Sequence, residues 1–237
     1  IDSKSEVNGK HSKDAIVSVL QNVFNEMQGF SASNPFLADM ERKLTEEGKY
    51  DLFKEKFEDN FGSTWEESRS DFDFIQDDVV EVLDEIDFMS IESGRNWCEK
   101  ATGDYKYKVE DFAQLVKKYL DKKENNHHIV FLIDEIGQYI GDDSKLMLNL
   151  QTVTEDLGTA CGGKAWIIVT SQQDIDSITK TKGNDFSKIQ GRFDTRLSLS
   201  SANVDEVIKK RILEKNEAGK QTLELLYDDC SLFYRDT

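Results

Sequence analysis

Residues 129–135 read IVFLIDE, an apolar run that ends in two adjacent carboxylates, Asp134 and Glu135. One helix length further along the chain, residues 165–170 form a second apolar run, which leads into the polar sequence Ser-Gln-Gln. Short continuous apolar runs with polar ends are typical of strands that are buried on both faces of a parallel sheet. Residues 146–157 carry apolar side chains at helical spacing. The order strand, helix, strand predicts a right-handed crossover between two parallel strands.

The chain on either side of these runs is predicted to be mostly helical. Before residue 125, apolar side chains recur at helical spacing in four segments, 14–30, 35–57, 77–88 and 107–120. The single proline of the chain, Pro35, follows an Asn and suits a first helical turn. After the second strand, the pattern predicts a helix, a third and weaker strand, and a further helix, at residues 174–189, 195–200 and 205–214.

Composition narrows the class of protein. The formal net charge is −17, and residues 66–92 alone hold eleven Asp/Glu against one Arg. Such a surface repels phosphate backbones, so direct binding of nucleic acid by this stretch is not expected; it is either a solvated helix face or a docking surface for a basic partner. There is no signal peptide or apolar run that would span a bilayer, and three cysteines without CxxC spacing indicate a reducing cytoplasm.

The two carboxylates at the end of the first strand are the strongest chemical signal. In a parallel sheet, the carboxyl ends of the strands face the ligand crevice. Asp134 is there expected to hold Mg²⁺ through a water, while Glu135 polarises the water that attacks a phosphate. The alternative is that an apolar strand ends in acids for purely local reasons, because strands must end in something polar.

Thr170 and Ser171 fall where the neighbouring strand ends. A hydroxyl at that point can orient the water between Glu135 and a γ-phosphate. The alternative is an N-cap, because Ser or Thr before a helix supplies the same hydroxyl for local reasons.

An arginine before the third predicted strand is the third signal. In the sequence GRFD at 191–194, Arg192 is a candidate for a guanidinium that reaches the nucleotide of a neighbouring subunit and neutralises charge in the transition state. The alternative is a surface salt bridge. Arg192 is favoured over Arg196 because GRFD is the local pattern that AAA+ proteins show.

Residues 158–164 match the GxxxxGK pattern of a phosphate-binding loop, but two observations argue against that role. The position that should supply a Ser or Thr for Mg²⁺ is Ala165. The segment also follows a predicted helix and precedes a strand, whereas a phosphate loop follows a strand and opens a helix. We expect a helix C-cap turn with Lys164 exposed, and no other segment of the sequence offers a phosphate-binding loop.

Residues 127–174 closely resemble the P-loop ATPase of bacterial BREX phage-defence systems, the BrxC or PglY family, and the resemblance extends through GRFDTRLSLS at 191–200. Over residues 1–125 it rests on helical character alone. The resemblance implies a very large cytoplasmic protein that binds ATP and Mg²⁺ and works with a DNA methyltransferase and accessory BREX proteins, meeting DNA only through that complex. It makes Asp134 and Glu135 the Walker B pair, Thr170 and Ser171 the sensor 1 candidates, and Arg192 the arginine finger of a possible homo-oligomer.

The expected fold class is therefore α/β, an incomplete parallel-sheet P-loop NTPase core of AAA+ type preceded by a mostly helical insertion. The expected parts are the insertion at 1–125, the Walker B to arginine-finger part at 126–203, and the start of a helical lid at 204–237. Because the Walker A loop is missing, we expect an internal fragment of a longer protein that is inactive by itself.

Two other functions fit the same sequence. One is a non-enzymatic interaction domain, with an acidic helical face on a degenerate nucleotide-binding core. The other is a STAND-type or origin-binding AAA+ switch, which shares the motifs and differs in its partners.

Overall fold

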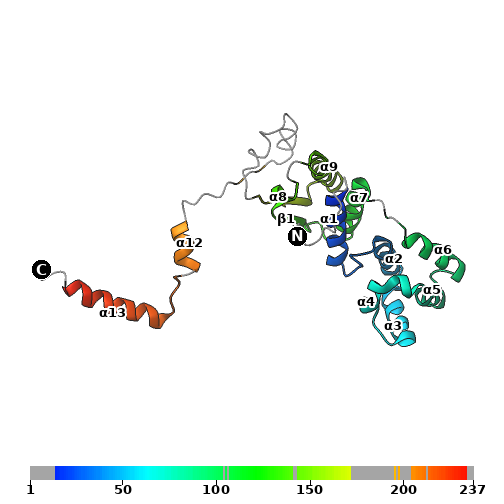
Figure 1. The fold of residues 1–237 in the computed structure, drawn as a ribbon, viewed down its shortest axis with the longest axis horizontal. Helices are drawn as coiled ribbons and strands as arrows, with labels where there is room; N and C mark the ends of the chain where they lie inside the picture. Colours follow the sequence, from blue (N-terminus) through cyan, green and yellow to red (C-terminus); the bar gives the residue numbers. More distant parts are fainter. Residues whose placement is uncertain are drawn as a thin grey trace. The chain divides into compact units, whose positions relative to one another are not determined.

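The computed structural model describes residues 14–103, 105, 107–140, 143–171, 195, 197, 204–211 and 213–233. The chain forms two compact units, residues 1–192 and 193–237. The described elements of the first unit (Figure 1) are α1 (Ala15–Met27), α2 (Pro35–Glu46), α3 (Tyr50–Phe61), α4 (Trp65–Ser68), the 3₁₀ helix η1 (Arg69–Phe74), α5 (Gln76–Glu85), α6 (Ile91–Ala101), α7 (Val109–Asp121), β1 (Ile129–Ile133), α8 (Ile136–Ile140), α9 (Ser144–Cys161) and β2 (Ala165–Val169). Those of the second are α12 (Val204–Arg211) and α13 (Glu217–Phe233).

The sheet contains two parallel strands within the described residues. Strands β1 and β2 pair in register from Ile129 opposite Ala165 to Ile133 opposite Val169, and α9 forms the crossover between them. The predicted strand, helix, strand unit is therefore confirmed. Of the third strand expected at 195–200, only residues 195 and 197 are described, and neither lies in a strand.

Among the described residues, one face of this sheet is covered by helices and the apolar side chains of the other face are exposed. The side chains of Ile129, Phe131 and Ile133 are buried, whereas Val130 and Leu132 are 54% and 52% exposed. On β2, Trp166 and Ile168 are likewise exposed. The prediction that the first strand is buried on both faces is wrong for the described structure, because the helices α1, α7 and α9 all lie on the same side of it.

Aromatic side chains join this helical layer to the sheet. The ring of Phe131 lies 6.3 Å from that of Phe24 on α1 and 5.7 Å from that of Phe112 on α7, measured between centroids. Helix α9 packs against both α1 and α7, and the buried N–H of Val17 donates to Oδ1 of Asn149. Two helices of the first 125 residues thus form part of the layer that supports the sheet.

The helices α2 to α6 surround a second core. Its centre is Trp65, which is fully buried and meets the rings of Phe53 and Phe57 edge-on at 5.1 and 5.4 Å. Helix α6 is not predicted from the sequence, because the residues on its buried side, Gly94, Cys98 and Ala101, are all small. A Cβ on Gly94 would lie 2.9 Å from Cγ1 of Val80, so the two helices approach more closely there than a side chain allows.

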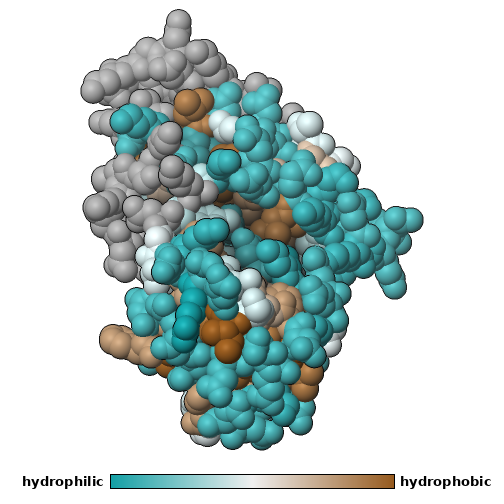
Figure 2. All heavy atoms as spheres, turned by 90° about the vertical axis from the view of Figure 1, so that its right-hand side faces the viewer, coloured by the Kyte–Doolittle hydropathy of each residue, from teal (hydrophilic) through white to brown (hydrophobic). Residues whose placement is uncertain are grey.

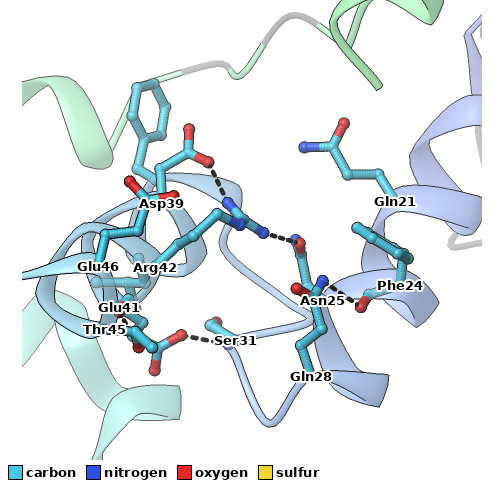
Figure 3. Close-up of polar contacts among 12 residues, drawn as sticks. Gln21, Phe24, Asn25, Gln28, Ser31, Asp39, Glu41, Arg42, Thr45 and Glu46 are labelled. Atoms are coloured by element: carbon cyan, nitrogen blue, oxygen red, sulfur yellow. Dashed lines mark hydrogen bonds and ion pairs between the residues drawn. The ribbon is translucent and has the colours of Figure 1, made fainter. Parts of the chain in front are cut away.

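A polar junction links the two helical groups (Figure 3). The guanidinium of Arg42 on α2 donates to Asp39 on the same helix at 2.8 Å and to Oδ1 of Asn25 on α1 at 2.7 Å. Asn25 is fully buried. Burial raises the pKa of Asp39 and lowers the pKa of Arg42, while the ion pair between them opposes both shifts. The junction therefore fixes α2 against α1 through directional bonds.

The acidic stretch at residues 66–92 is mainly the solvated surface of α5 and its neighbours. The face of the molecule shown in Figure 2, on the side of α5 and α6, is mostly hydrophilic with small hydrophobic patches. Bases of adjacent helices pair with some of the acids, as in Lys56 with Glu85 at 2.6 Å and Arg95 with Asp77 at 3.7 Å. Opposite these acids, α5 buries Val79, Val80, Val82 and Leu83.

The second unit is helical in its described part. Helices α12 and α13 carry exposed apolar side chains, among them Val207, Leu225 and Tyr227. Among the helices that the structure describes, in either unit, none has the length and apolar character needed to cross a membrane.

Candidate functional site at the carboxyl end of the sheet

The candidate site lies where the two parallel strands end. Ile133 pairs with Val169 at the ends of the two strands. The residues that follow them in the chain, Asp134 and Thr170, therefore also lie side by side. The N–H of Thr170 donates to the carbonyl of Ile133 at 3.0 Å, and the N–H of Ile136 donates to the carbonyl of Thr170 at 3.0 Å. Two backbone hydrogen bonds thus hold position 170 against the turn that joins β1 to α8.

The side chains at these positions bond to one another as well. The hydroxyl of Thr170 donates to Oδ1 of Asp134. The N–H of Glu135 lies 3.1 Å from Oδ1 of Asp134 and 3.1 Å from Oγ1 of Thr170, and it donates to both. The structure therefore brings together three of the residues that the sequence analysis selected.

The backbone of Glu135 is in the left-handed region, with φ of +52°. That conformation costs a residue with a Cβ roughly 1–2 kcal/mol of free energy, because Cβ approaches the following carbonyl oxygen. The two bonds to its N–H, together with the start of α8 at Ile136, supply the local stabilisation that holds the turn. No feature of the sequence predicts this conformation, since it occurs here without a glycine.

The site is accessible from solvent. Asp134 and Thr170 are exposed, and Glu135 and Ser171 are half-buried. Ser171 directly follows Thr170 at the end of β2. The fifth selected position, Arg192, lies outside the described residues, and so does the helix expected at 174–189.

The residues at this edge suit a cation that keeps part of its water shell. In the described part of the chain, no group of three or more His, Cys, Asp or Glu residues forms a metal cage. Mg²⁺ does not need one, because it usually binds through one or two carboxylates plus waters and substrate phosphates. The hydrogen bonds described for Asp134 both use Oδ1. A carboxylate has a second oxygen, which can accept a bond from a metal-bound water.

The GxxxxGK segment forms a helix C-cap turn, as predicted. Gly158 lies within α9, and Gly162 caps that helix in the left-handed conformation, with φ of +57° and ψ of +40°. Lys164 then leads into β2 and is half-buried, which corrects the expectation that it is exposed. The N–H of Lys164 donates to the carbonyl of Cys161, and its carbonyl accepts from the N–H of Ile129. These backbone groups therefore join the helix to the sheet.

Comparison with known protein families finds no family model that matches the chain, and no solved structure matches it significantly.

Proposed function

We propose that this chain is part of the ATP-hydrolysing, AAA+-like module of a bacterial BREX phage-defence protein. The observation that carries the proposal is the meeting of Asp134, Glu135 and Thr170 at the carboxyl end of two parallel strands. In open α/β sheets, ligands bind at that edge. Adjacent carboxylates there suit the hydrolysis of a phosphoanhydride, which requires a metal ligand and a proton acceptor.

Each residue has a separate part in the proposed reaction. When Mg²⁺ is bound with ATP, it neutralises charge on the phosphates. Asp134 would hold the hydrated ion at the end of β1 by accepting hydrogen bonds from its waters. Glu135 accepts a proton from the water that attacks the γ-phosphate. Arg192 is the candidate that reaches the nucleotide of a neighbouring copy, which makes a homo-oligomer part of the proposal.

The exposed apolar face of the sheet supports a larger core. Parallel strands are usually covered on both faces, and their continuous apolar sequences reflect this. Val130, Leu132, Trp166 and Ile168 are apolar, although the helices that the structure describes cover only the opposite face. We propose that the complete module has a further layer and a phosphate-binding loop from a segment outside these 237 residues. The proposed setting is the cytoplasm, with a DNA methyltransferase and accessory BREX proteins as partners.

Calorimetry with Mg-ATP tests the proposal that another segment of the protein supplies the phosphate-binding loop. The 237-residue chain by itself is expected to show no micromolar binding and no phosphate release, because its sequence offers no loop of the kind that holds phosphates with backbone amides and a lysine. A longer form of the protein that includes its phosphate loop is expected to do both. Micromolar binding of ATP by the 237-residue chain would contradict the interpretation of residues 158–164, and an inactive longer form would contradict the proposed function.

A further inference from the structure

We propose that Thr170 is a positioning residue for Glu135 and does not contact the γ-phosphate itself. In this role it holds the backbone of Glu135 in the left-handed conformation and thereby sets the direction of the carboxylate. The inference concerns the ground-state structure of the turn, and only its catalytic consequence rests on the proposed function.

The Thr170 hydroxyl has a limited capacity for hydrogen bonds. A threonine hydroxyl has one proton to donate. The Thr170 hydroxyl donates it to Oδ1 of Asp134, while its own oxygen, Oγ1, accepts from the N–H of Glu135. In this arrangement, the hydroxyl has no second proton for a phosphate oxygen. Its bonds are directed to the two residues of the β1–α8 turn.

The bonds of the Thr170 hydroxyl stabilise a backbone conformation of Glu135 that otherwise costs free energy. Glu135 has φ of +52° and carries a Cβ, so it favours the right-handed or extended regions in the absence of other contacts. A change of φ from the left-handed to the right-handed helical region rotates the side chain by about 120°. The carboxylate of Glu135 would then point in a different direction, although Asp134 and both strands had not moved.

The backbone hydrogen bonds of position 170 do not depend on its side chain. The bonds from Thr170 N–H to Ile133 and from Ile136 N–H to Thr170 remain with any non-proline residue at this position. A side-chain substitution can therefore remove the hydroxyl and keep the pairing of the strands.

Amide hydrogen exchange of the 237-residue chain, measured by NMR, tests the positioning role directly. Thr170→Val removes the hydroxyl with little change of shape, and Thr170→Ser keeps it. The Glu135 amide is expected to exchange at least about tenfold faster in the Val variant and within about threefold of wild type in the Ser variant. The amides of Ile136 and of position 170 itself are internal controls, and their protection should persist in both variants.

Equal protection of the Glu135 amide in wild type and in a folded Val variant would overturn the proposal. If the Val variant does not fold, the wild type and the Ser variant still test the left-handed conformation of Glu135 on which the proposal depends. A positive φ brings the amide proton and the α-proton of the same residue close together, so both proteins should show a strong cross-peak between these protons of Glu135. A weak cross-peak in wild type would overturn the proposal.

A kinetic measurement on the longer, ATP-hydrolysing form tests the catalytic consequence. Thr170→Val is expected to lower kcat at least about tenfold, to change KM for Mg-ATP less than about threefold, and to be rescued by Thr170→Ser. A rise in KM with unchanged kcat would indicate contact with the nucleotide and overturn the proposal. If wild type shows no turnover, the proposed function fails, whereas the exchange measurement still decides whether Thr170 positions Glu135.

Discussion

Glu135→Gln in the longer form of the protein is expected to lower ATP turnover by about 10²–10⁴-fold and to leave the Kd for ATP within about threefold of wild type. The amide keeps the shape of the carboxylate but cannot accept the proton of the attacking water. The backbone N–H of residue 135 still donates to Asp134 and Thr170, because those bonds do not involve its side chain. Phosphate release and calorimetry with Mg-ATP measure the two quantities.

Glu124→Gln is a matched control for this variant. Glu124 is exposed and lies shortly before β1, at the strand end opposite the site. The same loss of charge there should change turnover less than about twofold, as for a surface substitution away from special features. Turnover that is unchanged in Glu135→Gln would remove the general base from the account.

Glu41→Ala is expected to lower the free energy of unfolding by about 2–5 kcal/mol, because it removes a fully buried carboxylate that pairs with the partly exposed Arg69 and accepts buried hydrogen bonds. The Glu41 carboxylate has no exposed surface. It accepts hydrogen bonds from the N–H of Ser31, from Nε1 of Trp65 at 2.7 Å, from the hydroxyl of Tyr50 at 3.2 Å and from Arg69 at 3.0 Å. Without the carboxylate, the buried N–H groups of Ser31 and Trp65 would lose their acceptor. Urea denaturation provides the measurement.

Glu46→Ala on the same helix is the control for Glu41→Ala. Figure 3 shows Glu46 and Glu41 on the same helix. Glu46 pairs with Lys122 at 2.7 Å, but both side chains are exposed. Exposed ion pairs contribute about 0–1 kcal/mol, so this variant should stay within about 1 kcal/mol of wild type. Equal losses in the two variants would contradict the structural role assigned to Glu41.

The elements that sequence reasoning predicts well have a local cause. The two apolar runs of β1 and β2 are strands, and they are parallel because an 18-residue helix, α9, connects them. Helix α2 begins at Pro35 because the side chain of Asn34 accepts from the N–H groups of Phe36 and Leu37. In each case, the residues that determine the element lie within it or next to it.

The remaining features depend on partners that are distant in the sequence. The left-handed conformation of Glu135 is stabilised by Thr170, 35 residues away along the chain. The close contact of Gly94 with Val80 joins α5 and α6 at a position where α6 has no side chain. The same holds for the uncovered face of β1, since its apolar sequence alone does not show which face the helices cover. The proposed roles of Asp134, Glu135 and Arg192 stay predictions.

The effect of Mg²⁺ on the affinity for ATP is the most direct test of the proposed metal site. Calorimetry on the longer form would compare the Kd for ATP with Mg²⁺ and with a chelator, in wild type and in Asp134→Asn. The Asn side chain keeps an oxygen that can accept from Thr170 and Glu135, but it loses the negative charge that attracts the hydrated ion. Wild type is expected to bind ATP at least about tenfold more tightly with Mg²⁺, and the variant should lose most of that gain. A variant that retained the full Mg²⁺ effect would show that the metal binds elsewhere, and the proposed site at the carboxyl end of β1 and β2 would be wrong.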